Sequence, residues 1–331
     1  MQTKPDLQDA RNPANHLNPE FSPLMAKPGR LQTFLEYSVA KSVLTGFGLL
    51  PAPAAMALGR GMGKLAYAIA GDLRRTGQIN LRIAFPEKTE EERGRLLREC
   101  FDNLGRLLGF FSQFSSRSRD ELKQLIEVEG LENLKAAKSV RGNRLILFTG
   151  HIGAWELTSF GLALFDHPIT FLVRRLDNPR IEQLVDRIRK RFGNETIDKL
   201  SAARSMLKIL RSGETSLGLL TDLNTLDDEA IFIDFFGVPA ATTFVVAKLA
   251  VRTNTPLVPL FAPWCEEKGK YLLIVEPPIP PDNTGDEEAD VRDLTVKLTQ
   301  RIEKRIRQYP GQWLWIHKRW KTRPPGEPEI Y

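Results

Sequence analysis

Short apolar runs that alternate with helical stretches constrain the middle of this chain most strongly. Each run has five or six residues, which suits a strand but is too short for a buried helix. The runs cover residues 144–149, 169–173, 215–220, 231–236, 257–261 and 271–275. Helical stretches lie between several of them, at residues 154–164, 179–192, 202–211 and 243–252. This alternation predicts an α/β fold with a mixed, largely parallel central sheet that helices cover on both faces.

Further helices are expected on either side of this region. In residues 89–111 apolar side chains recur every three or four positions, opposite charged ones, and residues 287–308 repeat the pattern. A shorter helix is expected near residues 119–126. The sequence therefore predicts one α/β unit that begins with a long amphipathic helix and ends with another.

Residues 42–59 carry no charge for 18 positions, which is close to the shortest length that spans a bilayer. Pro51 and Pro53 interrupt this stretch, so we expect two short helices, at residues 34–49 and 54–70. Basic residues beside an apolar helix are typical of an element that lies in the interface of an anionic membrane. A buried helical hairpin in a soluble protein is the alternative. The basic residues concerned are Lys41, Arg60 and Lys64.

These patterns divide the chain into three parts. Residues 1–33 contain five prolines and no apolar run, which predicts a disordered leader without a signal peptide. Residues 34–72 form the helical, membrane-associating segment. Residues 73–331 form the α/β domain, which must carry any chemistry.

His151 and Glu156 follow directly after the predicted strand at residues 144–149. Inside one helix, a spacing of five would place the two side chains about 140° apart, so they would not meet. If His151 lies in the loop before the helix, its ring can fold back toward Glu156, whose carboxylate would fix the tautomer of a general base. Gly153 would then offer a backbone N–H to an oxyanion near the helix start. The alternative is a histidine and a glutamate that only cap a helix.

Basic residues are concentrated in two segments of a chain whose net charge is +6. Residues 171–192 hold seven basic against three acidic residues, and residues 297–323 hold nine against one. Tryptophans interleave with the second cluster, which is compatible with stacking on nucleic-acid bases and with lipid phosphates at a membrane interface. These tryptophans are Trp313, Trp315 and Trp320.

Arg174 differs from the other basic residues of the first cluster. It is expected at the end of a strand, where α/β enzymes bind their ligands. Residues 187–191 are interpreted as one solvated helix face.

No competing catalytic motif is present in the sequence. It has four histidines, two cysteines and no HExxH, paired-cysteine, Walker or G-x-S-x-G motif, which argues against zinc hydrolases, nucleoside triphosphatases and serine hydrolases and predicts no metal site. Two cysteines form no disulfide framework and indicate a reducing compartment. His317 is open to either packing or substrate contact.

Six short segments follow one another in a characteristic order along residues 34–331. They are GHIGAWE with His151 and Glu156, VRRLDNP with Arg174, Asp177 and Asn178, LLTDLN with Asp222, FFGVPAATT with Gly237 and Thr243, PLVPLF with Pro256 and Pro259, and WLWIHKRWKTRP with His317 and Arg319. In this order, and with glutamate as the acid of the histidine-x4-acid block, they resemble the lipid A late acyltransferases. These lauroyl- and myristoyltransferase-like enzymes are a branch of the lysophospholipid acyltransferase superfamily. The long polar leader departs from what that family requires.

The resemblance implies transfer of an acyl chain from a thioester of acyl carrier protein or coenzyme A to a hydroxyl of a lipid A precursor. His151 would be the general base, oriented by Glu156, with the Gly153 backbone as an oxyanion donor. The thioester is a co-substrate, so no cofactor is implied. For Asp222, orientation of Arg174 or of the acceptor and a structural role in a turn both stay open. Substrate contacts are expected from Arg174, Asp177, Asn178, Asp222, Gly237, Thr243, His317 and Arg319.

The resemblance also implies peripheral or monotopic association with the cytoplasmic face of a bacterial inner membrane. The expected partners are the glycolipid acceptor, the thioester carrier and the anionic membrane surface, and no nucleic acid is expected. Two alternatives remain. One is an acyltransferase for another lipid acceptor, such as a lysophospholipid or a phosphoinositide mannoside. The other is a non-catalytic membrane-binding protein with the same fold.

Overall fold

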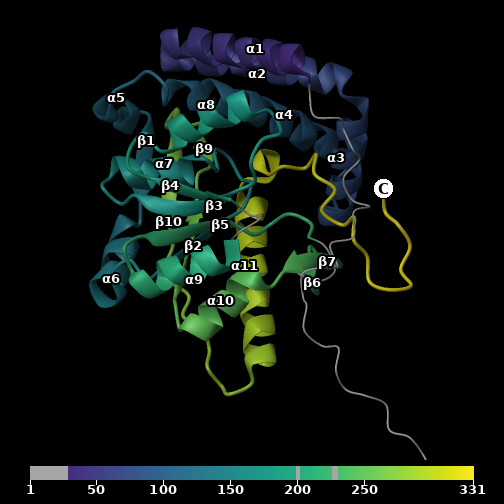
Figure 1. Cartoon of the computed structure of the whole chain (residues 1–331). Helices are drawn as coiled ribbons and strands as arrows, with labels where there is room; N and C mark the ends of the chain where they lie inside the picture. Colours follow the sequence, from purple (N-terminus) through teal and green to yellow (C-terminus); the bar gives the residue numbers. More distant parts are fainter. Residues whose placement is uncertain (1–28, 199–201, 226–229) are drawn as a thin grey trace, which may run out of the picture.

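A central eight-stranded sheet organises the molecule (Figure 1). The computed structural model describes residues 29–198, 202–225 and 230–331. The strands are β1 (Ile126–Glu129), β2 (Ile146–Thr149), β3 (Ile169–Val173), β4 (Glu195–Asp198), β5 (Ser216–Leu220), β6 (Ala230–Phe235), β7 (Val238–Thr243), β8 (Leu257–Phe261), β9 (Trp264–Cys265) and β10 (Lys270–Val275). In the sheet their order is β1-β10-β8-β2-β5-β3-β4, with β9 paired to β10.

The sheet is mixed and mostly parallel, as the sequence predicts. β8, β2, β5, β3 and β4 run parallel to one another, and β10 joins β8 in the antiparallel direction. Short apolar strands that are buried on both faces explain this arrangement, since β2 and β8 are buried at every position. One expected strand lies elsewhere. Residues 231–236 fall mainly in β6, which is not part of the central sheet. Among the described strands, β6 pairs with β7 in a separate hairpin.

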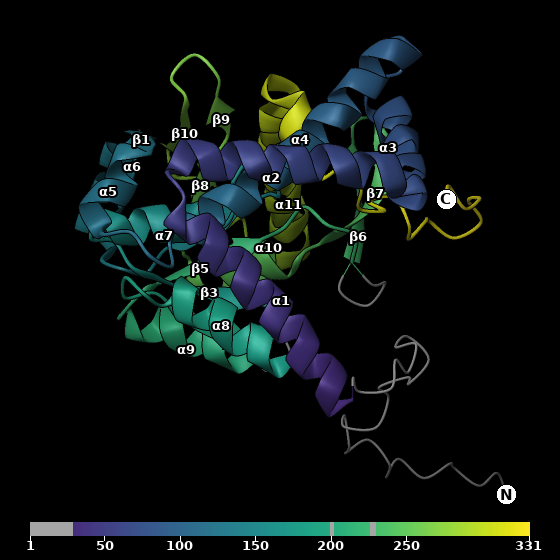
Figure 2. The same ribbon diagram turned by 90° about the horizontal axis from the view of Figure 1, so that it is seen from above.

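Helices cover both faces of the sheet (Figures 1 and 2). They are α1 (Arg30–Leu49), α2 (Ala52–Ile69), α3 (Gly71–Ala84), α4 (Glu90–Gln113), α5 (Arg119–Gln124), α6 (Leu131–Arg141), α7 (Leu157–Leu164), α8 (Pro179–Arg189), α9 (Ala202–Ser212), α10 (Val245–Thr253) and α11 (Glu287–Gln308). Local signals fix several of the ends. Thr89 and Glu92 form a capping box at the start of α4, and Asp286 caps α11.

The two predicted N-terminal helices are present and break at Pro51. α1 begins at Arg30, four residues before the expected start at residue 34, and residues 1–28 of the predicted leader lie outside the described part of the chain. Figure 2 shows α1 and α2 as a V that lies across the top of the α/β body. The domain boundary near residue 72 stays a prediction.

Glycines allow α2 to lie directly against α4. A Cβ atom added at Gly59 would lie 2.1 Å from the carbonyl oxygen of Gly105, and one added at Gly63 would lie 2.2 Å from that of Phe101. Only glycine permits backbones to approach this closely. The V of α1 and α2 is therefore packed onto the α/β body through α4.

The outer surface of the V is apolar. Among the described residues, most of the large apolar side chains that are exposed lie on α1, α2 and the start of α3. They are Leu31, Phe34, Leu35, Val39, Leu49, Leu58, Met62, Leu65, Ile69 and Leu73, and we call this set the apolar face. A fully buried hairpin is thus excluded for these helices. No helix in the described ranges combines the length and the apolar character needed to cross a membrane.

Candidate active site

A cavity of about 190 Å³ opens at the carboxyl ends of β2, β3 and β5. Such ends are where ligands bind in open α/β sheets. Its inner wall is apolar and comes from the strands, whereas its polar lining gathers near the loop that follows β2. The apolar wall includes Leu147, Phe148, Ile169, Phe171, Leu219 and Leu260, and the polar lining includes His151, Glu156, Arg174 and Arg189.

Asp222 holds His151. The Nδ1 atom of His151 lies 2.8 Å from Oδ1 of Asp222, and the backbone N–H of His151 donates to Oδ2 at 2.7 Å. Asp222 follows the end of β5, which is the parallel neighbour of β2, so both side chains emerge at the same edge of the sheet. Glycine at position 150 leaves room for the Asp222 carboxylate, because a Cβ atom added at Gly150 would lie 2.9 Å from Oδ2 of Asp222.

The carboxyl group of Asp222 is ionised although its side chain has no solvent exposure. Burial alone would raise its pKa, but the charge of His151 and hydrogen bonds from His151 and Trp313 together lower it. A carboxylate has only acceptor sites, so the His151 ring carries its proton on Nδ1. In the neutral form of the ring, the Nε2 atom then carries the lone pair, and it has no hydrogen-bond partner among the described residues.

The predicted contact between His151 and Glu156 is wrong. Arg189 on α8 donates to both oxygens of Glu156, with Nη2 2.6 Å from Oε1 and Nε 3.2 Å from Oε2. The spacing argument considered only the local chain, whereas α8 brings a nearly buried guanidinium that requires a counter-charge. Burial alone would lower the pKa of Arg189, yet the Glu156 carboxylate raises it. The prediction that residues 187–191 form one solvated helix face is consequently wrong for Arg189.

Gly153 does not serve the predicted oxyanion role, because its N–H donates to the carbonyl oxygen of Gln312 at 2.9 Å. Glycine is required here for the backbone. Its φ is +61°, and a Cβ would lie 2.1 Å from the carbonyl oxygen of Ala262. In the part of the chain that the structure describes, the N–H groups of Trp155 and Glu156 make no hydrogen bond, so the start of α7 still offers donors at this edge.

Of the residues predicted after β3, only Arg174 lines the cavity, where it is exposed. Asp177 is exposed on the same loop but outside the cavity lining. Asn178 is buried and structural: it caps α8 through Oδ1, and its Nδ2 donates to the Thr33 carbonyl oxygen and to Glu36 on α1. The contact of Asn178 with substrate stays a prediction, and the structure places this side chain outside the cavity lining.

The structure does not bring the predicted residues of the β6–β7 region to the cavity. Gly237 takes a φ of +76° in the tight turn between the two strands, and Thr243 ends β7. Arg319 is buried beneath the hairpin, where its guanidinium donates to the Ala241 carbonyl oxygen and to Thr242 Oγ1. Burial lowers the pKa of Arg319 to about 10. The contact of Arg319 with substrate stays a prediction, and the structure places this side chain outside the cavity lining.

His317 lies behind Asp222 rather than in the cavity lining. Its Nε2 accepts a hydrogen bond from the backbone N–H of Asn224 at 3.2 Å. Burial is the main cause that lowers its pKa to about 4, with contributions from the nearby positive charges. His317 is therefore neutral near pH 7 and holds the loop that carries Asp222.

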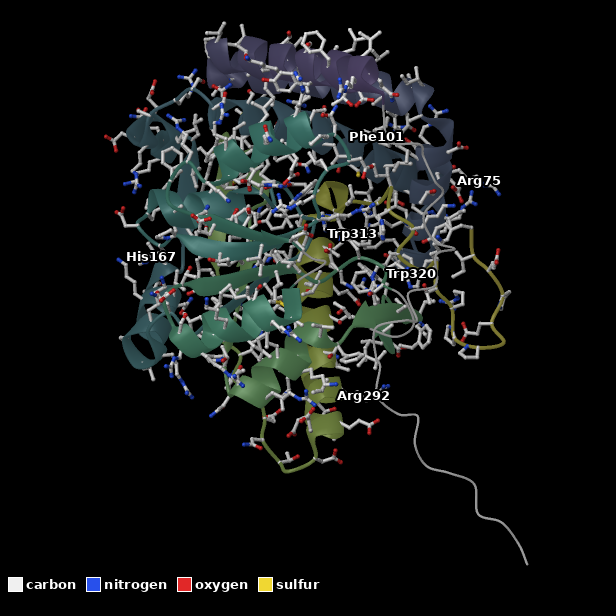
Figure 3. The ribbon with its side chains drawn as sticks, viewed as in Figure 1. Arg75, Phe101, His167, Arg292, Trp313 and Trp320 are labelled. Carbon is white, nitrogen blue, oxygen red and sulfur yellow. The ribbon has the colours of Figure 1, made fainter. Side chains whose placement is uncertain are left out.

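The interleaved tryptophans are interior residues. Trp313, Trp315 and Trp320 all have no exposure, and Figure 3 shows Trp313 and Trp320 inside the molecule, between the sheet and the β6–β7 hairpin. They cannot stack on nucleic-acid bases or lie at a membrane interface. Among the described residues, no group of histidine, cysteine and acidic side chains could hold a metal ion.

One of the two side-chain partners in this network, Asp222, could have been found from the sequence, and the other, Trp313, could not. Asp222 ends an apolar run predicted to be a parallel strand, and such ends share one edge of the sheet. Trp313 gave no signal of its own, since a buried tryptophan is common in any core.

Comparison with known proteins shows the family of the chain. The family model described as "Bacterial lipid A biosynthesis acyltransferase" matches residues 18–322. A "Lipid A biosynthesis lauroyltransferase" of Escherichia coli K12 is 30% identical over 320 residues, which cover 95% of this chain and 99% of that protein. A "Lipid A biosynthesis myristoyltransferase" of the same strain is 24% identical over 315 residues, 95% of each chain. A "Lipid A biosynthesis acyltransferase" of Haemophilus influenzae is 27% identical over 256 residues, 77% of each chain.

The chain belongs to the bacterial lipid A biosynthesis acyltransferase family. This confirms the family resemblance and the expected class of enzyme, an O-acyltransferase.

Proposed function

We propose that this protein transfers a fatty acyl chain from a thioester to a hydroxyl of a lipid A precursor, with His151 as the general base. The observation that carries the proposal is the pairing of His151 Nδ1 with the buried Asp222 at 2.8 Å. A carboxylate in this position fixes the tautomer and stabilises the imidazolium that forms when the other ring nitrogen takes a proton. Asp222, rather than Glu156, is thus the orienting residue.

The reaction needs few parts. Nε2 of His151 takes the proton of the acceptor hydroxyl as its oxygen attacks the thioester carbonyl carbon. The tetrahedral intermediate then collapses, the C–S bond breaks, and the thiolate leaves with the proton from His151. A thiolate is a good leaving group, so no separate strong acid is required. The acyl donor is a co-substrate held by acyl carrier protein or coenzyme A, and no cofactor takes part.

The cavity suits both the acyl chain and the thioester group of such a donor. Its apolar wall, which lies along the buried strands, would receive the acyl chain, and the thioester would then lie beside His151 at the strand ends. The free N–H groups of Trp155 and Glu156 would stabilise the oxyanion. Arg174, exposed at the mouth, would contact the phosphorylated acceptor.

The apolar face supports peripheral or monotopic binding to the cytoplasmic side of the inner membrane. Its side chains would enter one leaflet, while neighbouring basic side chains stay with the headgroups. These basic residues are Lys41, Arg60 and Lys64. Arg60 is itself paired with Asp102, so Lys41 and Lys64 are the better candidates for lipid phosphates.

The test is mass spectrometry of purified protein incubated with a lipid A precursor and either acyl-carrier-protein or acyl-CoA thioesters. We expect an ester product of the precursor, and parallel reactions with a lysophospholipid and a phosphoinositide mannoside identify the acceptor class. His151→Ala should reduce the rate by about 10²–10⁴-fold, and Asp222→Asn by a similar factor. No transfer to any acceptor, or full activity of folded His151→Ala, would refute the proposal.

A further inference from the structure

Trp313 donates a hydrogen bond to the carboxylate that holds His151. Its indole Nε1 lies 2.7 Å from Oδ2 of Asp222, the same oxygen that accepts the backbone N–H of His151. Asp222 thus receives its hydrogen bonds from two segments that are far apart in the sequence. Since the Asp222 side chain has no solvent exposure, bulk water does not share this task.

The backbone around Trp313 also holds the loop of His151. Gly153 donates to the Gln312 carbonyl oxygen at 2.9 Å, and Leu314 donates to the His151 carbonyl oxygen at 3.1 Å. Ile152 and Trp313 form the antiparallel bridge between these two bonds. The backbone fixes the indole relative to the histidine loop, so the side chain reaches Asp222 in one defined geometry.

The indole ring is itself immobilised by packing. The Trp313 side chain has no solvent exposure. Its ring packs edge to face against that of Trp315, with 4.6 Å between the ring centroids, and against that of Phe235, with 5.6 Å between the centroids. A rigid donor is what an orienting carboxylate requires, because any rotation of Asp222 would move the base.

We propose that Trp313 is a positioning residue for the general base, acting through Asp222 rather than by contact with substrate. The indole N–H fixes the rotation of the Asp222 carboxylate and takes part of its negative charge. This inference rests on the proposed function, because it assigns the partner of the orienting residue. A tryptophan that only fills the core would leave the behaviour of His151 unchanged.

The substitution Trp313→Phe removes the donor and keeps an apolar ring. We expect kcat to fall by about ten- to hundredfold, the range seen when an outer partner of a functional histidine is lost, while KM changes little. With one donor fewer, more of the carboxylate charge is directed at the His151 ring, so the acid limb of the pH–rate profile should move to higher pH. The other charged or titratable groups around His151 are Glu156, Arg174, Arg189, His317, Arg319 and Lys321, and this substitution leaves them in place.

Trp315→Phe is the matched control. Trp315 is equally buried and also uses its indole N–H, but donates it to the Pro310 carbonyl oxygen at 2.6 Å. Both variants lose one ring and one buried hydrogen bond, so they should lose similar thermal stability. A shifted pH profile in Trp313→Phe alone supports positioning. Equal changes in kcat and pH profile for the two variants, or a wild-type profile in Trp313→Phe, would overturn it.

A second measurement does not depend on the variant folding or on activity. In the ¹⁵N-labelled wild-type protein, the indole N–H resonance of Trp313 should shift with the protonation of the His151 ring, and His151→Ala should abolish this step. An indole N–H chemical shift that does not change when the His151 ring is protonated would overturn the inference even if acyl transfer is observed. Absence of acyl transfer with the coupling intact would instead refute the proposed function.

Discussion

Arg189 and Glu156 form a nearly buried ion pair in the wall of the cavity, with Nη2 of the arginine 2.6 Å from Oε1 of the glutamate. The pair joins α8 to the start of α7, and both of its side chains line the cavity. It changes what the histidine-x4-glutamate pattern means here. The histidine pairs with Asp222, and the glutamate neutralises a neighbouring arginine.

Glu156→Gln should therefore reduce stability, because it leaves the Arg189 guanidinium without its counter-charge in a place that water hardly reaches. We expect the free energy of unfolding to fall by about 1–3 kcal/mol, measured by urea denaturation. Arg187→Ala on the same helix is the control, since Arg187 is exposed and should change stability by less than about 0.5 kcal/mol. If Glu156→Gln loses as much activity as Asp222→Asn while its stability is unchanged, Glu156 acts on His151 after all.

His317 should make the protein less stable in mild acid. Its pKa is about 4 in the folded state, below its ordinary value of 6.5, so the unfolded chain binds the extra proton in the interval between them. Stability from this group is present above pH 6.5 and is lost as the pH falls toward 4. His317→Gln, which can still accept from Asn224, should show a weaker fall in unfolding free energy between pH 7 and pH 5. Parallel curves for variant and wild type would exclude this role of His317.

The apolar face should bind a lipid surface. Leu65→Glu and Ile69→Glu change side chains that are 62% and 75% exposed, so folding should not suffer, but vesicle binding should weaken by about tenfold or more for each. Val140→Glu is the control, because Val140 is 79% exposed on α6, away from this face. Co-sedimentation with vesicles of mixed anionic and zwitterionic lipid measures the effect. Equal binding by Ile69→Glu and Val140→Glu would contradict the proposed orientation.

The glycine contact between α2 and α4 should tolerate no side chain. Gly105→Ala places a methyl group 2.1 Å from the Gly59 carbonyl oxygen and should lower the free energy of unfolding by about 1–3 kcal/mol. Gly61→Ala, with open space around its Cβ position, should raise it by up to about 1 kcal/mol through helix propensity. Thermal denaturation compares the two. Similar melting temperatures would mean that the helices can move apart at no cost.

Sequence predicted best those elements whose periodicity is strong. The helix at residues 287–308 and the strand at 169–173 occur with the expected bounds. α3 was missed because Thr76, Gly77 and Asn80 make up much of its buried face, so that Leu81 and Ala84 alone give no clear apolar period. β4 was missed because it is a short edge strand without an apolar run.

The site was predicted in part for a related reason. His151 followed from its place after a buried strand, which is local information. Its partner Asp222 lies 71 residues away, and only the parallel pairing of β2 with β5 brings them together. The local rule instead selected Glu156, because sequence spacing cannot show the arginine that α8 supplies.

The bridge between Ile152 and Trp313 has a consequence for synthesis of the chain. The loop of His151 leaves the ribosome long before Gln312, Trp313 and Leu314, so its backbone partners and the indole donor to Asp222 are made only later. Contacts between such distant segments form late, because the chain must lose the entropy of closing a long loop before these contacts can stabilise it. A nascent chain that ends before Gln312 therefore has His151 but lacks the backbone and indole groups that hold it in the folded protein.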